Sequence, residues 1–358
     1  MESSAESKKA GAAAGRHLSP EAALEFCRSA FVRAGMPDQD AAICSSVLVE
    51  TSLRGVDTHG IALLPMYARN LRKGVYNPRP DMRLTGGGPG AAVLDADNAL
   101  GVLAEYRAME HAISLAREAG VAMVGVRRST HFGAGIYYAM MALAHDMIGL
   151  AGSNGPAVMA PYGGTRRAMH NMPLAAAIPT LEEPPIAMDF AMSVVAFRRI
   201  TAAAEAGEPI PLGWAVDEAG HPTTDAAAGR SGALLPLGYK GYALGILIDV
   251  LAGVLTGAGF GDSIAWESQG APQNTGHFAA AINVAAFMPA EAFKRRADAL
   301  ARRLRAVPPQ DPAEPVRVPG ERGARVRAER LREGIPVPDA LHARLASLAS
   351  ELGLAFPE

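Results

Sequence analysis

The spacing of apolar residues along this chain predicts helices alternating with strands. One helical stretch has apolar residues three or four positions apart, at Val102, Tyr106, Met109, Ile113 and Ala116. Gly120 follows it as a stop signal. Short apolar runs predict buried strands at residues 121–126, 148–151, 174–178 and 186–190. Helices are expected at residues 137–145 and 193–206, so the pattern indicates an α/β core.

The N-terminal part has a different, helical pattern. Ser19, Pro20 and Glu21 have the residue types of a helix start, and a second helix is expected over residues 38–54. Breakers at residues 77–80 and the glycine cluster at 86–90 then interrupt the pattern. We place a domain boundary there and interpret the cluster as a flexible hinge, with a phosphate cradle as the alternative. The predicted segments are 1–17 (disordered), 18–85 (helical) and 86 onward (α/β).

Composition describes a soluble globular protein. The chain has 358 residues, enough for about two domains, with 49% hydrophobic and 20% charged residues. A formal charge of −2 provides no field that would attract nucleic acid or an anionic membrane. The apolar run at 241–257 contains Asp249, which favours a buried core helix over a membrane segment. The N-terminus has no secretory h-region, and Cys27 and Cys44 are expected to be buried thiols, so we predict a cytoplasmic protein.

Two histidines beside glycine are the first candidates for catalysis. His59 precedes Gly60 after Val-Asp-Thr, and His131 lies in Ser-Thr-His-Phe-Gly. Imidazole gains and loses a proton near neutral pH, which makes it the usual acid/base group. Asp57 lies two residues before His59 and is placed to orient its ring. The dinucleotide, P-loop, nucleophile-elbow and zinc-protease motifs are all absent from the sequence.

Other polar residues stand at the ends of apolar segments. Asp189 ends a predicted strand, where it would suit a ribose hydroxyl or cap the helix expected near Ser193. Lys240 lies between glycines before the long apolar helix and could bind a phosphate or a carboxylate. On residue type alone, a metal site formed by His170, Asp57 and the two candidate histidines is an alternative. Their spacings are long and irregular, so we expect no metal.

These motifs, in this order, resemble the type 2 malate/L-lactate dehydrogenase family. The resemblance covers nearly all of residues 19–354. Its most specific parts are LRGVDTHG at 53–60, STHFGAG at 129–135 and GEPIPLGWAVDEAGHPTTD at 207–225. The segments LPLGYKGYAL at 235–244 and NTGHF at 274–278 add to it. The family includes ureidoglycolate and L-sulfolactate dehydrogenases, 2,3-diketogulonate reductase and a cyclic-ketimine reductase.

The resemblance implies an L-sulfolactate dehydrogenase-like fold. Family members have a mixed-sheet α/β domain that binds NADH or NADPH in a non-Rossmann manner, which accounts for the missing fingerprint. Their N- and C-terminal segments jointly form a small helical domain. We therefore assign residues 86–310 to the cofactor domain and 311–358 to a segment that returns to the helical domain. The family also implies a homodimer that acts on a small-molecule substrate.

Site residues can be carried over from the family position by position. His131 matches the usual proton donor and acceptor, and His59 matches a residue that contacts or protonates substrate. The positions that match cofactor-binding segments are Asn154, Gly155, Asp189, Phe190, Ala191, Tyr239, Lys240, Pro319, Gly320 and Glu321.

The substrate-binding positions depart from the family pattern. Family members commonly have arginine four residues after the first histidine, where it can clamp a carboxylate, and this chain has Leu63. Candidate substrate-binding residues are Leu63, Tyr67, His170 and Arg199, with His170 or Arg199 as replacements for the arginine. The sequence thus predicts an NAD(P)H-dependent oxidoreductase of 2-oxo acids or cyclic ketimines, with an atypical substrate as an option. The alternatives are a catalytically lapsed member that serves as a binding or partner subunit, and a metal-dependent hydrolase.

Overall fold

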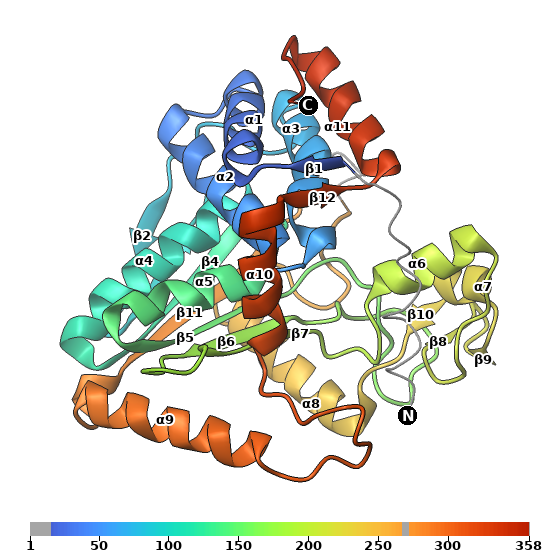
Figure 1. Cartoon of the computed structure of the whole chain (residues 1–358). Helices are drawn as coiled ribbons and strands as arrows, with labels where there is room; N and C mark the ends of the chain where they lie inside the picture. The colour runs from blue at the N-terminus through green and yellow to red at the C-terminus, as the bar shows by residue number, and fades with distance from the viewer. Residues whose placement is uncertain (1–15, 267–271, 358) are drawn as a thin grey trace. The chain divides into compact units, whose positions relative to one another are not determined.

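The computed structural model describes residues 16–266 and 272–357. By contacts the chain divides into two compact units, each described here by itself. One unit contains the residues up to Arg69 together with those from Gly323 onward, and the other spans Asn70–Arg322. Figure 1 labels the elements of both units.

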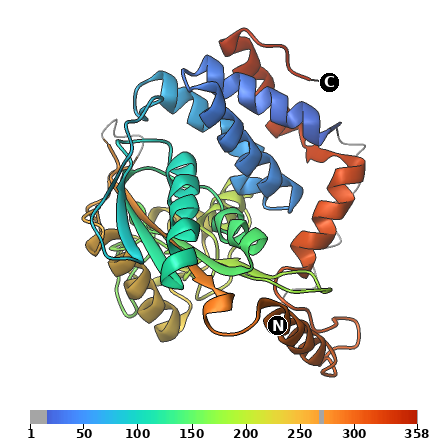
Figure 2. The same ribbon diagram turned by 90° about the vertical axis from the view of Figure 1, so that its left-hand side faces the viewer.

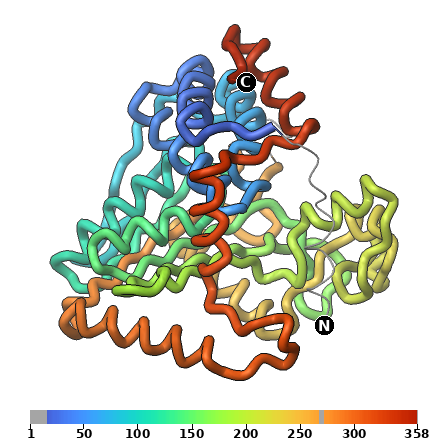
Figure 3. Tube along the Cα trace, in the orientation of Figure 1, coloured from blue at the N-terminus to red at the C-terminus, as the bar shows by residue number. Residues whose placement is uncertain are grey.

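The first unit is helical and joins the two ends of the chain. Its helices are α1 (Pro20–Arg33), α2 (Asp38–Leu53), η2 (Asp57–His59), η3 (Ile61–Leu63), α3 (Leu64–Arg72), α10 (Glu321–Glu333) and α11 (Asp339–Leu352). Strand β1 (Arg16–Leu18) pairs antiparallel with β12 (Ile335–Val337), so N-terminal and C-terminal traces run side by side (Figure 3). The Ser19 hydroxyl accepts a hydrogen bond from Ala22 N, which confirms the expected cap of α1.

The second unit is built on a seven-stranded mixed sheet in the order β2-β3-β4-β11-β5-β6-β7. The strands are β2 (Arg83–Thr85), β3 (Ala91–Asp95), β4 (Val121–Ser129), β5 (Met147–Ser153), β6 (Leu174–Ile178), β7 (Ile186–Phe190) and β11 (Thr275–Asn283). Strands β3 and β4 are parallel, and the other neighbouring pairs are antiparallel. The four apolar runs expected to be strands all lie in this sheet.

Helices cover both faces of the sheet (Figure 2). On one face lie α4 (Gly101–Ala119), α5 (Gly135–Met141) and η4 (Ala142–His145). On the other lie α8 (Gly238–Asp249) and the π-helical turn η5 (Val250–Val254). The backbones meet closely at glycines: a Cβ on Gly149 would lie 2.1 Å from Ala139 O, and one on Gly276 would lie 1.8 Å from Ala252 O. These contacts hold α5 and η5 close against the sheet.

The second unit also contains elements that are not strands of this sheet. A three-stranded sheet has the order β10-β8-β9. Its strands and the nearby helices are β8 (Ala215–Val216), β9 (Pro222–Thr223), β10 (Ala233–Leu234), α6 (Phe197–Ala206) and α7 (Ala226–Ser231). After β11 come η7 (Val284–Ala286) and α9 (Ala290–Arg305).

Several expectations about boundaries were wrong. The glycine cluster is no hinge between units, because it is the turn of the β2–β3 hairpin, where Gly86 and Gly87 have φ of 79° and 109°. By contacts the α/β unit runs from Asn70 to Arg322 and includes β2, whereas the predicted cofactor domain spans residues 86–310. Residues 1–15 of the predicted disordered segment lie outside the described residues, whereas Arg16 and His17 pair in β1.

Two predicted helices also differ from the structure. The helix expected from Ser193 begins at Phe197, because Ser193 instead forms an antiparallel bridge with Pro236. The apolar run at 241–257 is helical, but it is not a buried core helix, since one of its faces is exposed to solvent. No helix among the described residues is long and apolar enough to span a membrane.

Candidate functional site

The turn that carries His131 follows the end of β4 and is held by its neighbours. Thr130 Oγ1 donates a hydrogen bond to Ala99 O at 3.1 Å. It accepts one at 2.9 Å from the backbone N–H of Gly101, which is the first residue of α4. Gly133 has a φ of 79°, a backbone conformation that residues with a side chain rarely adopt. The His131 side chain is half-buried. The backbone on both sides of this histidine is therefore fixed by the protein itself.

Asn154 is a structural junction at the end of β5. Its Nδ2 donates to Asp249 Oδ1 at 2.9 Å and to Gly259 O at 2.8 Å, and its Oδ1 accepts from Gly276 N at 2.9 Å. Both hydrogens of the side-chain amide are thereby used within the protein. Oδ1 keeps a second acceptor site, and contacts of Asn154 and Gly155 with a cofactor stay predictions. The sequence did not predict a role for Asp249 in this junction.

His170 lies directly on Gly155. A Cβ on Gly155 would lie 3.0 Å from the His170 ring, so a side chain at this position would press against that ring. His170 Nδ1 donates to Pro156 O at 2.8 Å. Burial lowers the pKa of His170 from 6.5 to about 4, which outweighs the opposite effect of that hydrogen bond. At neutral pH the ring is uncharged and its one hydrogen is on Nδ1, so the free Nε2 can only accept a hydrogen bond and the ring cannot replace the positive charge of an arginine.

Asp189 ends β7 and caps α5. Its Oδ2 accepts a hydrogen bond from Ile136 N at 3.0 Å, so the helix that it caps is α5 and not the one near Ser193. Desolvation by the surrounding atoms raises the pKa of Asp189 to about 6, and hydrogen bonds from backbone N–H groups oppose this shift. Asp189 and Phe190 are both exposed at the surface, and Ala191 is half-buried.

The segment at Pro319–Glu321 lies along β7. Pro319 O accepts from Ala187 N at 3.0 Å. Gly320 has a φ of 103°, and a Cβ there would lie 2.6 Å from the Pro185 carbonyl. Arg305 donates to Glu321 Oε1 at 2.8 Å, so this carboxylate is engaged in an ion pair. The structure thus brings the predicted C-terminal segment next to the strand that carries Asp189.

The start of α8 also lies beside this strand end. Leu237 N donates to Met192 O at 2.7 Å, and a Cβ on Gly241 would lie 3.0 Å from the same oxygen. Tyr239 is 65% exposed, and Lys240 is exposed as well. Since Met192 follows Ala191 directly, the aromatic and basic pair is close to the end of β7. Arg199 lies on α6, where its guanidinium stacks over Trp214 at 5.1 Å.

The remaining candidates belong to the helical unit. A Cβ on Gly60 would lie 2.0 Å from Ser52 Oγ, which explains the glycine after His59. His59 Nδ1 lies 2.9 Å from Thr58 Oγ1. The Asp57 carboxylate forms a bidentate ion pair with Arg330, with Nη2 3.0 Å from Oδ2. Asp57 is therefore anchored to α10, a contact that the sequence did not predict.

Leu63 and Tyr67 are core residues of the structure. Leu63 is 2% exposed and Tyr67 is fully buried. Both follow the His59 turn, in η3 and α3. Their burial indicates a packing role, and a direct contact of these side chains with substrate remains a prediction.

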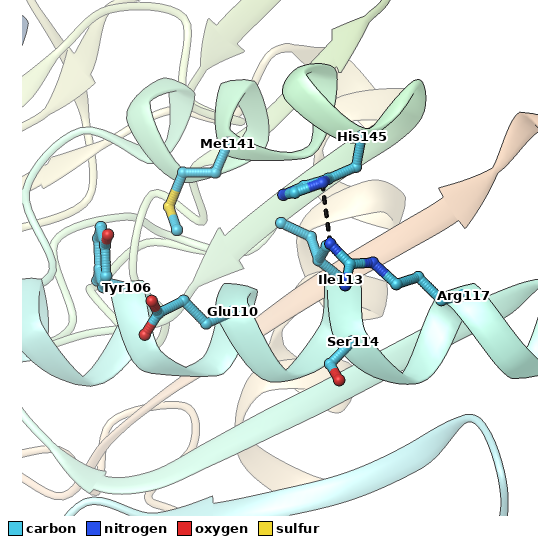
Figure 4. Close-up of a pocket in the computed structure, with 7 residues that line it drawn as sticks. All are labelled: Tyr106, Glu110, Ile113, Ser114, Arg117, Met141 and His145. Carbon is cyan, nitrogen blue, oxygen red and sulfur yellow. Dashed lines mark hydrogen bonds between the residues drawn. The ribbon is translucent and has the colours of Figure 1, made fainter.

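The α/β unit has a surface pocket that these residues do not line. It has a volume of about 400 Å³ and is open to solvent between α4 and η4 (Figure 4). At one end Arg117 Nη2 lies 3.1 Å from His145 Nδ1. The full lining is Tyr106, Glu110, Ile113, Ser114, Arg117, Met141 and His145. None of the site residues predicted from the sequence lines it. Within residues 16–266 and 272–357, no group of three His, Cys, Asp or Glu side chains could hold a metal ion.

Comparison with known proteins identifies the family of this chain. Residues 18–346 match the malate/L-lactate dehydrogenase family. The chain belongs to this family. Malate dehydrogenase of Pyrococcus horikoshii is 33% identical over 340 residues, which cover 92% of this chain and 94% of that protein. Ureidoglycolate dehydrogenase (NAD(+)) of Escherichia coli O157:H7 is 34% identical over 333 residues, covering 92% and 95%.

The fold expected from the resemblance is confirmed. The solved structure of sulfolactate dehydrogenase from Methanocaldococcus jannaschii matches with a TM-score of 0.88 and 33% identity. The match covers 95% of this chain and 98% of that chain. This malate/L-lactate dehydrogenase family member therefore has the L-sulfolactate dehydrogenase-like α/β fold.

Proposed function

We propose that this protein is an NAD(P)H-dependent oxidoreductase that transfers hydride to a small carbonyl or imine substrate. Family membership supports the reaction class. The observation that carries the proposal is the hydrogen bond from Ile136 N to Asp189, which joins the end of β7 to the helix that follows the His131 turn. A group suited to proton transfer and a group suited to a ribose thereby share one end of one sheet.

The residues present fit a nicotinamide cofactor by the chemistry of their donors. A carboxylate has more acceptor capacity than the α5 cap uses, so Asp189 can also accept from ribose hydroxyls. Lys240, exposed at the start of α8, would bind a phosphate. Gly155, Phe190, Ala191, Tyr239 and the Pro319–Glu321 segment are the further contacts that we propose. The bound cofactor would supply the hydride.

His131 would move the proton that the reaction requires. Hydride addition to a carbonyl or imine carbon leaves negative charge on the oxygen or nitrogen, and an adjacent acid must neutralise it. His131 would donate this proton in reduction and take it back in oxidation. His59, with Asp57 anchored by Arg330, is proposed as a further substrate contact.

The proposed substrates are 2-oxo acids, 2-hydroxy acids and cyclic ketimines. Most of these carry a carboxylate, which needs a cation or several hydrogen bonds. Because His170 is neutral at pH 7, Arg199 is the better candidate to provide the charge. Without such a cation the substrate would be less charged than those of relatives.

We also propose that the active form is a homodimer in the cytoplasm. From Tyr239 to Gly257 the exposed side chains are apolar except for Lys240. The large ones are Tyr239, Leu244, Ile246, Leu247, Val250, Val254 and Leu255. We call this set the α8 face, and a second copy of the chain would cover it. Buried thiols at Cys27 and Cys44 are consistent with a reducing compartment.

The test is cofactor-dependent turnover. NADH and NADPH are each combined with a panel of 2-oxo acids, cyclic imine carboxylates and uncharged ketones, and loss of nicotinamide absorbance is followed. We expect activity with one cofactor, and His131→Ala should lower kcat by about 100-fold or more while cofactor affinity stays the same.

The matched control is His221→Ala, since His221 is exposed on the turn between β8 and β9. Its activity should equal that of the wild type. Full activity of His131→Ala would refute the role assigned to His131. Cofactor binding without turnover on any substrate would favour the lapsed, binding-subunit alternative.

A further inference from the structure

Two titratable side chains face each other in the interior of the α/β unit. Glu105 on α4 and His277 on β11 are both 0% exposed, and Oε2 lies 3.6 Å from Nδ1. Buried groups of this kind are rare unless they serve a purpose, because desolvation disfavours their charged forms. The proposed chemistry above assigns neither residue a role.

His277 reaches the peptide that precedes the candidate proton donor. Its Nε2 lies 2.9 Å from Thr130 O, and Thr130 is followed directly by His131. A carbonyl oxygen can only accept, so Nε2 must carry the hydrogen of this bond. In a neutral ring Nδ1 then has a lone pair, and it points toward Glu105.

The charge state of the pair follows from its surroundings. An ionised carboxylate facing the lone pair of Nδ1 would be repelled, so a proton must lie between the two groups. Neither Glu105 oxygen nor His277 Nδ1 has a partner within hydrogen-bond distance, and the 3.6 Å between Oε2 and Nδ1 lies just beyond it. A buried ion pair with no supporting hydrogen bonds is costly, and burial raises the pKa of Glu105. Burial therefore favours the protonated form of Glu105.

We propose that Glu105 is a positioning residue for the hydride-transfer reaction: its protonated carboxyl holds His277 in the Nε2–H tautomer, and His277 holds the peptide between Thr130 and His131. The inference rests on the function proposed above. Glu105 acts through His277 and touches no reacting atom.

Further contacts at the start of α4 act on the same peptide. Gly101, one turn before Glu105, is so close that a Cβ would lie 2.2 Å from Thr130 O and 2.7 Å from His131 O. On the other side the Phe132 ring packs on His277, with centroids 5.1 Å apart. The first turn of α4 and strand β11 thus both contact the His131 turn. If the His277 ring changed its orientation, the position of this turn would change as well.

The test compares two replacements of Glu105 of similar size. Glu105→Gln keeps an N–H that can donate to Nδ1, so kcat should stay within about threefold of the wild type. Glu105→Leu removes the donor to Nδ1 and with it one of the two restraints on the His277 ring, and kcat should fall about 10- to 100-fold. NADH affinity and the melting temperature of Glu105→Leu should not fall, because an apolar side chain of similar volume is often tolerated in place of a buried polar one. Wild-type kcat in Glu105→Leu, or an equal loss in both variants, would overturn the proposal.

A second pair of variants covers the case in which Glu105→Leu does not fold. His277→Gln retains an N–H for Thr130 O, whereas His277→Leu does not. Higher kcat in His277→Gln than in His277→Leu supports the proposal, and equal kcat contradicts it.

Nitrogen NMR of ¹⁵N-histidine-labelled wild-type protein tests the pair without turnover. At pH 7 His277, assigned from its loss in His277→Gln, should be a neutral ring with hydrogen on Nε2. An imidazolium or an Nδ1–H tautomer would refute the proposed arrangement. If NADH and NADPH both fail to bind, the proposed function fails, while this spectrum still decides the state of Glu105 and His277.

Discussion

At the scale of single residues, burial changes the pKa of a histidine side chain, His170. His170 has a pKa of about 4 in the fold against an ordinary value of 6.5, because its ring is desolvated between Gly155 and the Pro156 carbonyl. The unfolded chain therefore binds a proton near pH 6.5, whereas the folded chain does so only near pH 4. Stability from this residue is complete above pH 6.5 and decreases as the pH falls toward 4.

Replacing His170 should consequently make the protein less sensitive to acid. We expect His170→Gln to show a smaller loss of unfolding free energy between pH 7 and pH 5 than the wild type, because glutamine does not titrate. Urea denaturation at both pH values measures this difference. The exposed His221→Gln serves as control and should behave as the wild type. An unchanged pH dependence in His170→Gln would contradict the assigned pKa.

Leu63 illustrates how burial changes an expectation from sequence. Arginine at this position in relatives suggested a missing carboxylate clamp, yet Leu63 is 2% exposed. Leu63→Arg should lower the free energy of unfolding by about 3 kcal/mol, because it buries a charge with no partner prepared for it. Leu63→Met, of similar volume, should cost less than about 1.5 kcal/mol. Unchanged stability of Leu63→Arg with faster turnover of pyruvate would show instead that this position faces the substrate.

At the scale of elements, the sequence predicted the bounds of strands that depend on the apolar pattern of their own residues. The apolar runs at β6 and β7 were predicted with their observed bounds, because buried strands need continuous apolar side chains. The glycine cluster was misinterpreted because a tight hairpin turn and a flexible linker use the same residue type. The late start of α6 depends on the bridge between Ser193 and Pro236, which lie far apart in sequence.

The α8 face is an element-scale feature with a direct test. Leu247→Glu places a charge in the middle of this face, and Leu247 is 52% exposed, so the protomer should tolerate it. We expect the dimer to dissociate to monomer in light scattering coupled to size exclusion, because a charge in an apolar interface is left desolvated. Leu300→Glu, equally 52% exposed on α9, is the matched control and should remain dimeric. A dimeric Leu247→Glu would exclude this face as the interface.

At the scale of the whole molecule, the sequence predicted the fold class and part of the candidate site. Alternation of helices and strands indicated α/β, and the resemblance supplied the mixed sheet and the joined chain ends, which pair as β1 and β12. Strand order could not be predicted, because periodicity does not encode which strands pair. Glu105 and His277 were missed for the same reason: 172 positions separate them, and only the packing of α4 on β11 brings them together.

The central claim is that this chain binds a reduced nicotinamide cofactor and uses it for hydride transfer. Titration of the purified protein with NADH and with NADPH, followed by nicotinamide fluorescence, tests the claim most directly. Saturable binding of at least one cofactor, weakened by Asp189→Ala and by Lys240→Ala, is the predicted result. Absence of saturable binding for both cofactors would contradict the account.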